Sequence, residues 1–173
     1  MTISLYDISV TSYLQTLGAV AGYLDKGLSH CREKSVDPGE IVETRLYPDM
    51  LPFRFQIQSL VHHSVGAIEG IKRGKFSPPK DLPAHDYPAL QGLVAEARQT
   101  LQSLAPDVVN GYESAEVVFE FRERRLPFTA LGFLASFSLP NFYFHATTAY
   151  DILRSKGVPV GKRDFLGQLR LKS

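Results

Sequence analysis

Apolar residues recur every three or four positions along four stretches of the chain, a spacing typical of helices with one buried face. These stretches cover residues 5–34, 52–73, 87–104 and 129–157. Four long helices joined by loops predict an all-α fold, a four-helix bundle. The length of 173 residues suits one domain spanning 1–173 with a sizeable core.

The period changes between the third and fourth stretches. Val117, Phe119 and Phe121 alternate with more polar neighbours, which predicts a small β-hairpin or extended insertion before the last helix. Residues 76–88, with the sequence FSPPKDLPAHDYP, are rich in proline and are expected to form a surface loop.

Glycine and proline mark special positions within two of the predicted helices. Gly18, Gly22 and Gly27 weaken the first helix, so it depends on tertiary packing or uses its glycines for close approach by a neighbour. Thr129 can cap the start of the fourth helix. Pro140 lies inside that helix and is expected to kink it or divide it in two.

The fourth helix carries a row of polar residues on an otherwise apolar face. At about 100° per residue, Ser138 and Asn141 lie within roughly 40° of His145. Hydrogen-bonding side chains on a buried face either form a satisfied internal network or take part in function. Both interpretations stay open from the sequence.

Two adjacent histidines lie on the second helix. On a helical wheel His63 falls at the edge of the apolar stripe, beside Leu60 and Ala67, whereas His62 lies nearly opposite it. His63 is therefore the better candidate to face the core, and His62 is expected to meet solvent or a partner.

These residues suggest a metal site. Asn141 and His145 are four residues apart on one helix face, so both can approach one ion, and His63 can complete a three-ligand site for a divalent metal such as zinc or nickel. With Ser138, the same residues can instead bind a small molecule. The alternative is a satisfied core network with the backbone groups that Pro140 exposes.

Composition excludes several classes of protein. The net charge is +1 and the basic residues are scattered, so no nucleic-acid partner is expected. No apolar segment of 18 or more residues and no signal-like N-terminus occurs, so we expect a cytoplasmic protein without membrane contact. The single cysteine, Cys31, excludes an intrachain disulfide and fits a reducing compartment.

Three segments carry a family resemblance: HHSVGAIEGI at 62–71, LPNFYFHATTAYDILRSKGVP at 139–159 and GKRDFLG at 161–167. Together they resemble a bacterial and fungal family of uncharacterised proteins, of domain-of-unknown-function type. That family is similar to the DinB/YfiT-like metalloenzymes, which are four-helix bundles and often dimers. The resemblance therefore implies a DinB-like four-helix bundle and a homodimer.

The resemblance also implies a ligand set. In the metalloenzymes one histidine of the second helix and two of the fourth, spaced four apart, hold a divalent metal. Here the fourth-helix positions correspond to Asn141 and His145, and the second-helix position to His62 or His63. Asparagine thus replaces one of the three histidine ligands. The metal, and the thiol-transferase or hydrolase activities that it supports in the relatives, are therefore not implied for this chain by the full ligand set.

Two functions from different classes follow. The first is a small-molecule-binding protein or metal-dependent enzyme with a degenerate His/Asn/His site, in which the histidines hold a water or a substrate thiol and Asn141 orients it. The second is a non-catalytic, dimeric helical binding or interaction module, in which the polar row is purely structural. The sequence identifies neither a substrate nor a reaction.

Overall fold

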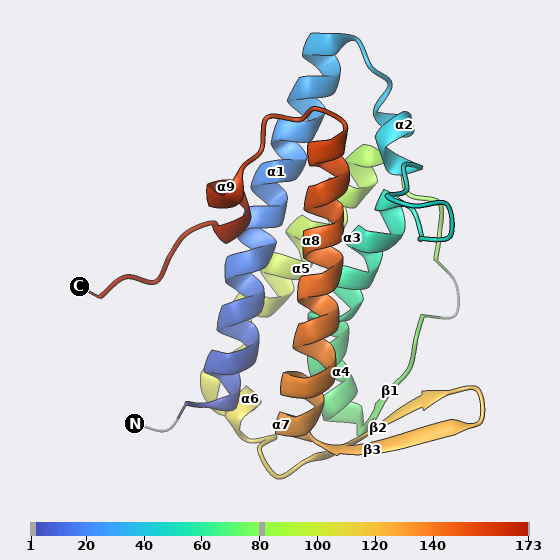
Figure 1. The fold of residues 1–173 in the computed structure, drawn as a ribbon. Helices are drawn as coiled ribbons and strands as arrows, with labels where there is room; N and C mark the ends of the chain where they lie inside the picture. The colour runs from blue at the N-terminus through green and yellow to red at the C-terminus, as the bar shows by residue number, and fades with distance from the viewer. Residues whose placement is uncertain (1–2, 80–81, 173) are drawn as a thin grey trace.

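A computed structural model describes residues 3–79 and 82–172 of the chain (Figure 1). The helices are α1 (Ser12–Lys34), α2 (Pro38–Val42), α3 (Phe53–His62), α4 (Val65–Arg73), α5 (Tyr87–Gln102), α6 (Pro106–Asn110), α7 (Ala130–Phe133), α8 (Leu139–Ser155) and α9 (Lys162–Leu166). Two π-helical segments, η1 (Asp7–Thr11) and η2 (Leu134–Ser138), precede α1 and join α7 to α8. The strands are β1 (Lys75–Phe76), β2 (Glu116–Phe121) and β3 (Arg124–Thr129).

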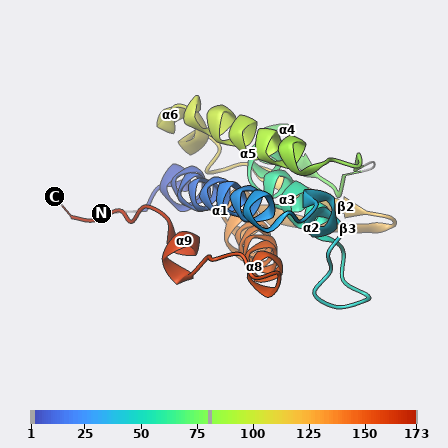
Figure 2. The same ribbon diagram turned by 90° about the horizontal axis from the view of Figure 1, so that it is seen from above.

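The long helices lie side by side and bury one continuous core. Helix α3 packs against α8 and α5, and α1 packs against α5 and α8 (Figures 1 and 2). Because each helix turns an apolar stripe inward, Val20, Leu60, Val94 and Ile152 are all fully buried in this core. Among the described residues, no helix is long and apolar enough to cross a membrane.

A small sheet lies at one end of the long helices (Figure 1). Strands β2 and β3 form the predicted hairpin, with Glu116 opposite Thr129 and Phe121 opposite Arg124. The loop prediction for 76–88 was wrong at its start, because β1 pairs in parallel with β2 and buries Phe76. Two residues are too few to show alternation in the sequence, so β1 was not predicted. With a three-stranded sheet beside the helices, the fold is mostly helical rather than all-α.

The second predicted helix is interrupted. Helix α3 ends at His62, and α4 begins at Val65 after Ser64 adopts a non-helical conformation (φ −111°, ψ −83°). The Ser64 hydroxyl donates to the carbonyl of Val61 at 3.0 Å and so competes with helical hydrogen bonding. The expectation of one continuous helix over 52–73 was therefore wrong, and the break falls beside His63.

The last long helix accommodates Pro140 without a break. Thr129 caps its start as predicted, since its hydroxyl oxygen accepts from the Gly132 amide at 3.0 Å. Helical residues then continue through α7, the wider turns of η2 and α8. Because proline lacks an amide hydrogen, the π-helical turns just before it absorb the interrupted hydrogen bonding, and the helix is not divided in two.

Of the three glycines in α1, one is needed for close packing. A methyl group on Gly27 would lie 2.2 Å from the Tyr87 hydroxyl oxygen and 3.1 Å from Leu153. The same group on Gly22 would meet nothing within 4 Å. Gly27 therefore lets α5 and α8 approach α1 closely, whereas Gly22 only lowers helix propensity.

Candidate functional site

Two histidines from distant parts of the chain meet inside the helical layer. His63 follows α3 directly, His145 lies in α8, and their ring centroids are 5.9 Å apart with an angle of 21° between the planes. Each residue is only 9% exposed. The contact between α3 and α8 therefore brings together the two imidazoles that the sequence suggested as partners.

Gln56 fixes the tautomer of His145. The Gln56 side-chain nitrogen donates to the carbonyl of Leu51 at 2.8 Å, which turns its oxygen toward His145 Nδ1 at 2.8 Å. An amide oxygen can only accept, so Nδ1 carries the hydrogen and Nε2 of His145 presents a lone pair. This arrangement is the one that orients histidine ligands in metal sites.

His63 lies in an aromatic surrounding with one nitrogen left open. Its ring centroid is 5.4 Å from that of Phe76 and 5.7 Å from that of Phe137. Its Nδ1 is buried and has no hydrogen-bond partner in the described part of the chain. Buried polar atoms are nearly always paired, so the fold leaves this nitrogen, next to a second imidazole, unsatisfied.

Both imidazoles are neutral at physiological pH. Burial, reinforced by the neighbouring His62 and His145, lowers the pKa of His63 to about 3. Burial alone lowers the pKa of His145 to about 4. A neutral imidazole keeps one lone pair, so the pair can accept hydrogen bonds or coordinate a cation at pH 7.

Ser138 links the backbone of His63 to the Tyr13 side chain. Its hydroxyl donates to the carbonyl of His63 at 2.6 Å, and the Tyr13 hydroxyl lies 2.9 Å from the Ser138 hydroxyl oxygen. Since serine has one hydroxyl hydrogen, Tyr13 is the donor in the second contact. The chain Tyr13, Ser138, His63 carbonyl thus anchors the α3–α4 break and positions the imidazole, while the Ser138 hydrogen is committed to the backbone.

Asn141 is tied to its own helix. Its side-chain nitrogen donates to the carbonyl of Phe137 at 2.7 Å, in the region that the π-helical turns and Pro140 disturb. No hydrogen bond joins it to His63 or His145 within residues 3–79 and 82–172. Of the four candidate residues, the structure therefore brings the two histidine rings close together and gives Ser138 and Asn141 backbone partners.

His62 does not belong to this pair. It is half-buried, and its Nε2 donates to the carbonyl of Ser77 at 2.9 Å. The expectation that it meets solvent was only partly right, because the start of the 77–86 loop covers its ring. Sequence reasoning missed Gln56, although it lies seven residues, or two helical turns, before His63 and so on the same helix face.

The residues fit a divalent metal in part. An ion bonded by a ring nitrogen at about 2.1 Å lies roughly 3 Å from the ring centre, so rings sharing an ion have centroids at most about 6 Å apart. The separation of 5.9 Å lies just within this limit, which is reached only when a nitrogen of each ring points almost directly at the ion. However, no group of three His, Cys, Asp or Glu side chains suited to a metal occurs in the described residues, and an asparagine amide is a weak third ligand.

Comparison with known proteins places the fold. The chain is similar to a DinB family member protein from Shewanella denitrificans, whose crystal structure matches with a TM-score of 0.79 at 25% identity, over 98% of this chain and 95% of that one. No curated protein matches the sequence. A family model for a domain of unknown function, DUF1993, matches residues 5–166, and the chain therefore belongs to the DUF1993 family.

Proposed function

We propose that this DinB-like protein binds a small molecule at the pair formed by His63 and His145. The observation that supports it is the pairing of two buried, neutral imidazoles with ring centroids 5.9 Å apart, one with a fixed tautomer and the other with a buried, unpaired nitrogen. We further infer that the four long helices form a DinB-type bundle in one domain, as the similarity to the DinB family member supports.

The chemistry of the pair favours ligands that donate hydrogen bonds. His145 Nε2 offers a lone pair, so a hydroxyl or thiol group is the matching partner. General-base catalysis works best with a pKa near the working pH, and values of about 3 and 4 lie far below neutrality. Binding of an alcohol or thiol therefore fits the site better than proton abstraction at pH 7.

A weakly held divalent metal, zinc or nickel, is the second version of this site. His63 and His145 would supply two nitrogen ligands, and the Asn141 amide oxygen a feeble third. Such an ion lowers the pKa of a bound water or thiol. In both versions Gln56 orients His145, and the link from Tyr13 through Ser138 positions His63.

Metal content separates the two versions. We expect protein purified without an affinity tag to carry zinc, nickel or iron at well below one ion per chain, with a melting temperature that a chelator leaves unchanged. Elemental analysis and thermal melting measure this. One tightly held ion per chain, with a lower melting temperature after its removal, would establish the metal-dependent version instead.

Ligand binding is tested with a small thiol, 2-mercaptoethanol, monitored by the NMR signals of the histidine rings. We expect saturable shifts of the His63 and His145 signals that disappear in His145→Phe. The matched control is His30→Gln, which replaces a histidine outside the pair. Equal shifts in all three proteins, or none in the native one, would contradict the proposal.

The alternative function, a dimeric interaction module, is supported by exposed aromatic residues on α8. Tyr143 is 40% and Phe144 56% exposed, and the Phe144 ring centroid lies 5.3 Å from that of His145. Exposed aromatic residues are typical of protein interfaces. We propose a homodimer through this part of α8.

Light scattering coupled to size-exclusion chromatography tests the dimer. We expect Phe144→Glu to convert a dimer into a monomer, because a buried unpaired carboxylate disfavours the interface. Phe121→Glu is the control, since Phe121 is also exposed, at 44%, but lies on the hairpin. A native monomer, or a dimer unaffected by Phe144→Glu, would contradict the proposed interface.

A further inference from the structure

A second hollow lies between α1, α5 and the tail, the segment of chain that follows α9. Its volume is about 630 Å³, within the range of small-molecule sites. No histidine lines it, so it is distinct from the site described above. Side chains that can donate hydrogen bonds line its walls: Arg98 and Gln102 of α5, Gln15 of α1, and Gln168 and Arg170 of the tail.

The start of the tail is held against α1. The Gln15 side-chain nitrogen donates to the carbonyl of Leu166 at 3.1 Å. Lys26 of α1 pairs with Asp164 of α9 at 2.7 Å. Gly167 has a positive φ of 61°, and a methyl group on it would lie 3.1 Å from a side chain of α1, so glycine suits this close turn. The fold itself therefore forms the hollow before a ligand binds.

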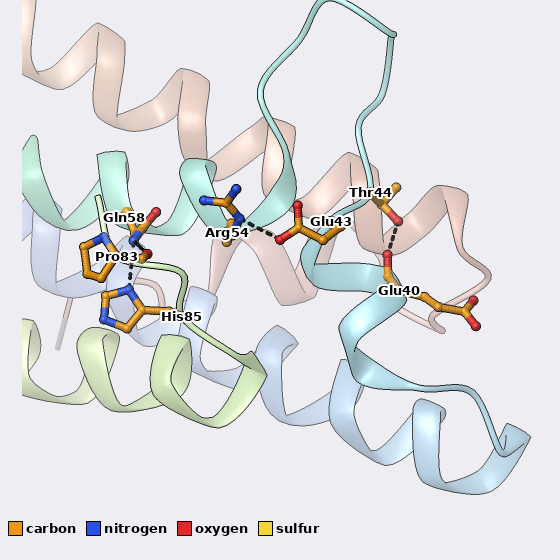
Figure 3. Close-up of polar contacts among 7 residues, drawn as sticks. All are labelled: Glu40, Glu43, Thr44, Arg54, Gln58, Pro83 and His85. Carbon is orange, nitrogen blue, oxygen red and sulfur yellow. Dashed lines mark hydrogen bonds and ion pairs between the residues drawn. The ribbon is translucent and has the colours of Figure 1, made fainter. Parts of the chain in front are cut away.

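Two guanidinium groups line the hollow, Arg98 from α5 and Arg170 from the tail. In the part of the chain that the structure describes, neither forms an ion pair. Arg54 shows the contrast, because its Nε donates to Glu43 Oε1 at 2.7 Å and its charge is met within the chain (Figure 3). Ser173, which lies outside the described residues, has an uncharged side chain, so the two arginines set the side-chain charge of the walls.

Arg98 is the less exposed of the two arginines. Its side chain is half-buried, and its Nε is buried without a hydrogen-bond partner among the described residues. Its Nη2 lies 4.0 Å from the point where a side chain on Gly18 would begin, and Gly18 itself lines the hollow. A half-buried positive charge without a counter-charge is costly, and an anion in the hollow reduces that cost.

We propose that the hollow between α1, α5 and the tail binds a small organic oxyanion, a carboxylate or a phosphate monoester. Its oxygens accept hydrogen bonds from Arg98 and Arg170, because a planar guanidinium matches two oxygens of such a group. Its apolar body packs against Leu14 and Leu169, which line the same hollow. This site functions whether or not the histidine pair binds anything.

Hexanoate and hexyl phosphate are the probes, titrated into the native protein at low chloride concentration and followed by calorimetry. We expect saturable binding of at least one of them, with a dissociation constant of about 1 mM or lower. The tighter probe identifies the head group as carboxylate or phosphate. Hexanol, which is neutral, and hexylamine, which is positively charged, should each bind at least about tenfold more weakly. Anion binding no tighter than that of hexanol would overturn the proposal.

Substitutions locate the site. Arg98→Gln and Arg170→Gln should each weaken binding of the tighter probe at least about tenfold, since each removes a charge-assisted hydrogen bond. Lys172→Gln, which removes a charge from the same tail, and Arg54→Gln are the matched controls and should leave the affinity unchanged. Because Arg170 is exposed, its variant tests the site even if Arg98→Gln does not fold. Unaltered binding in Arg170→Gln would overturn the assignment.

A rival occupant of the hollow is the carboxylate at the end of this chain. Extending the chain by a short glycine and serine segment beyond Ser173 moves that carboxylate away and should leave the affinity for the probes unchanged. Binding that occurs only in the extended protein would show that the hollow holds the chain's own end, and would overturn the proposal.

Discussion

The free energy of unfolding is expected to fall by about 4 kcal/mol between pH 7 and pH 5 because of His63 and His145. Their unfolded-state pKa is 6.5, and burial lowers the folded-state values to about 3 and about 4. Below pH 6.5 the unfolded chain therefore takes up protons that the folded protein does not. Each pH unit in this window is worth about 1.4 kcal/mol per histidine, or about 2 kcal/mol each down to pH 5.

The direction of this effect follows from the sign of the shift. The contribution is complete above about pH 7 and is lost as the pH falls through 6.5 toward the folded-state values. His62, whose pKa burial also lowers, acts in the same direction. Two other titrating groups, the Glu120 and Asp164 carboxyls, begin from pKa values of 4.5 and 3.8 and titrate mainly below this window.

Urea unfolding at half-unit pH intervals in native protein and His63→Phe measures the effect. The variant should lose about half of the slope, and its stability at pH 7 should be little changed, because Nδ1 of His63 has no hydrogen bond to lose. His145→Phe provides the contrast, since it also strips Gln56 Oε1 of its donor and should destabilise at pH 7. Parallel pH profiles for native protein and His63→Phe would show that the imidazole is not buried in its neutral form.

Gly27→Ala is expected to destabilise the protein by about 3 kcal/mol. The new methyl group would lie 2.2 Å from the Tyr87 hydroxyl oxygen, which donates to the carbonyl of Leu24 at 2.9 Å in the core. Tyr87 must therefore move, and the substitution adds the strain of overpacking to the loss of a buried hydrogen bond. Thermal or urea unfolding measures this loss.

Gly22→Ala, five residues away on the same helix, is the matched control. A methyl group there meets nothing within 4 Å, so alanine should stabilise α1 by about 0.5–1 kcal/mol through its higher helix propensity. Tyr87→Phe in the Gly27→Ala background removes the clashing oxygen and should recover part of the lost stability. Equal effects of the two glycine substitutions would contradict close packing at Gly27.

The helical elements could be predicted because their signals are local. The apolar stripe of α1, the Thr129 cap and the alternation of β2 each depend on residues a few positions apart. The break at His63–Ser64 could not be predicted in this way, because a serine inside a helix is common and its effect here depends on Ser138 of a distant helix. Strand β1 was missed because pairing with β2 defines it.

The candidate site also has a part that the sequence predicted and a part that it did not. The row of Ser138, Asn141 and His145 on one face followed from helical spacing, and His63 was favoured over His62 from its place beside the apolar stripe. Which polar atoms are already satisfied could not be inferred. Ser138 and Asn141 turn to backbone carbonyls, and Gln56 reaches His145 across the α3–α8 contact.

The sequence by itself determined which residues form the long helices and which side chains lie on their inner faces, since both depend on spacing along one element. Only the tertiary structure decided that two imidazoles meet and that their charge is suppressed. It also decided which polar side chains are already paired, as Gln56 is with His145. Hydrogen bonding and desolvation depend on atoms that distant segments bring together, and spacing along the chain carries no information about them.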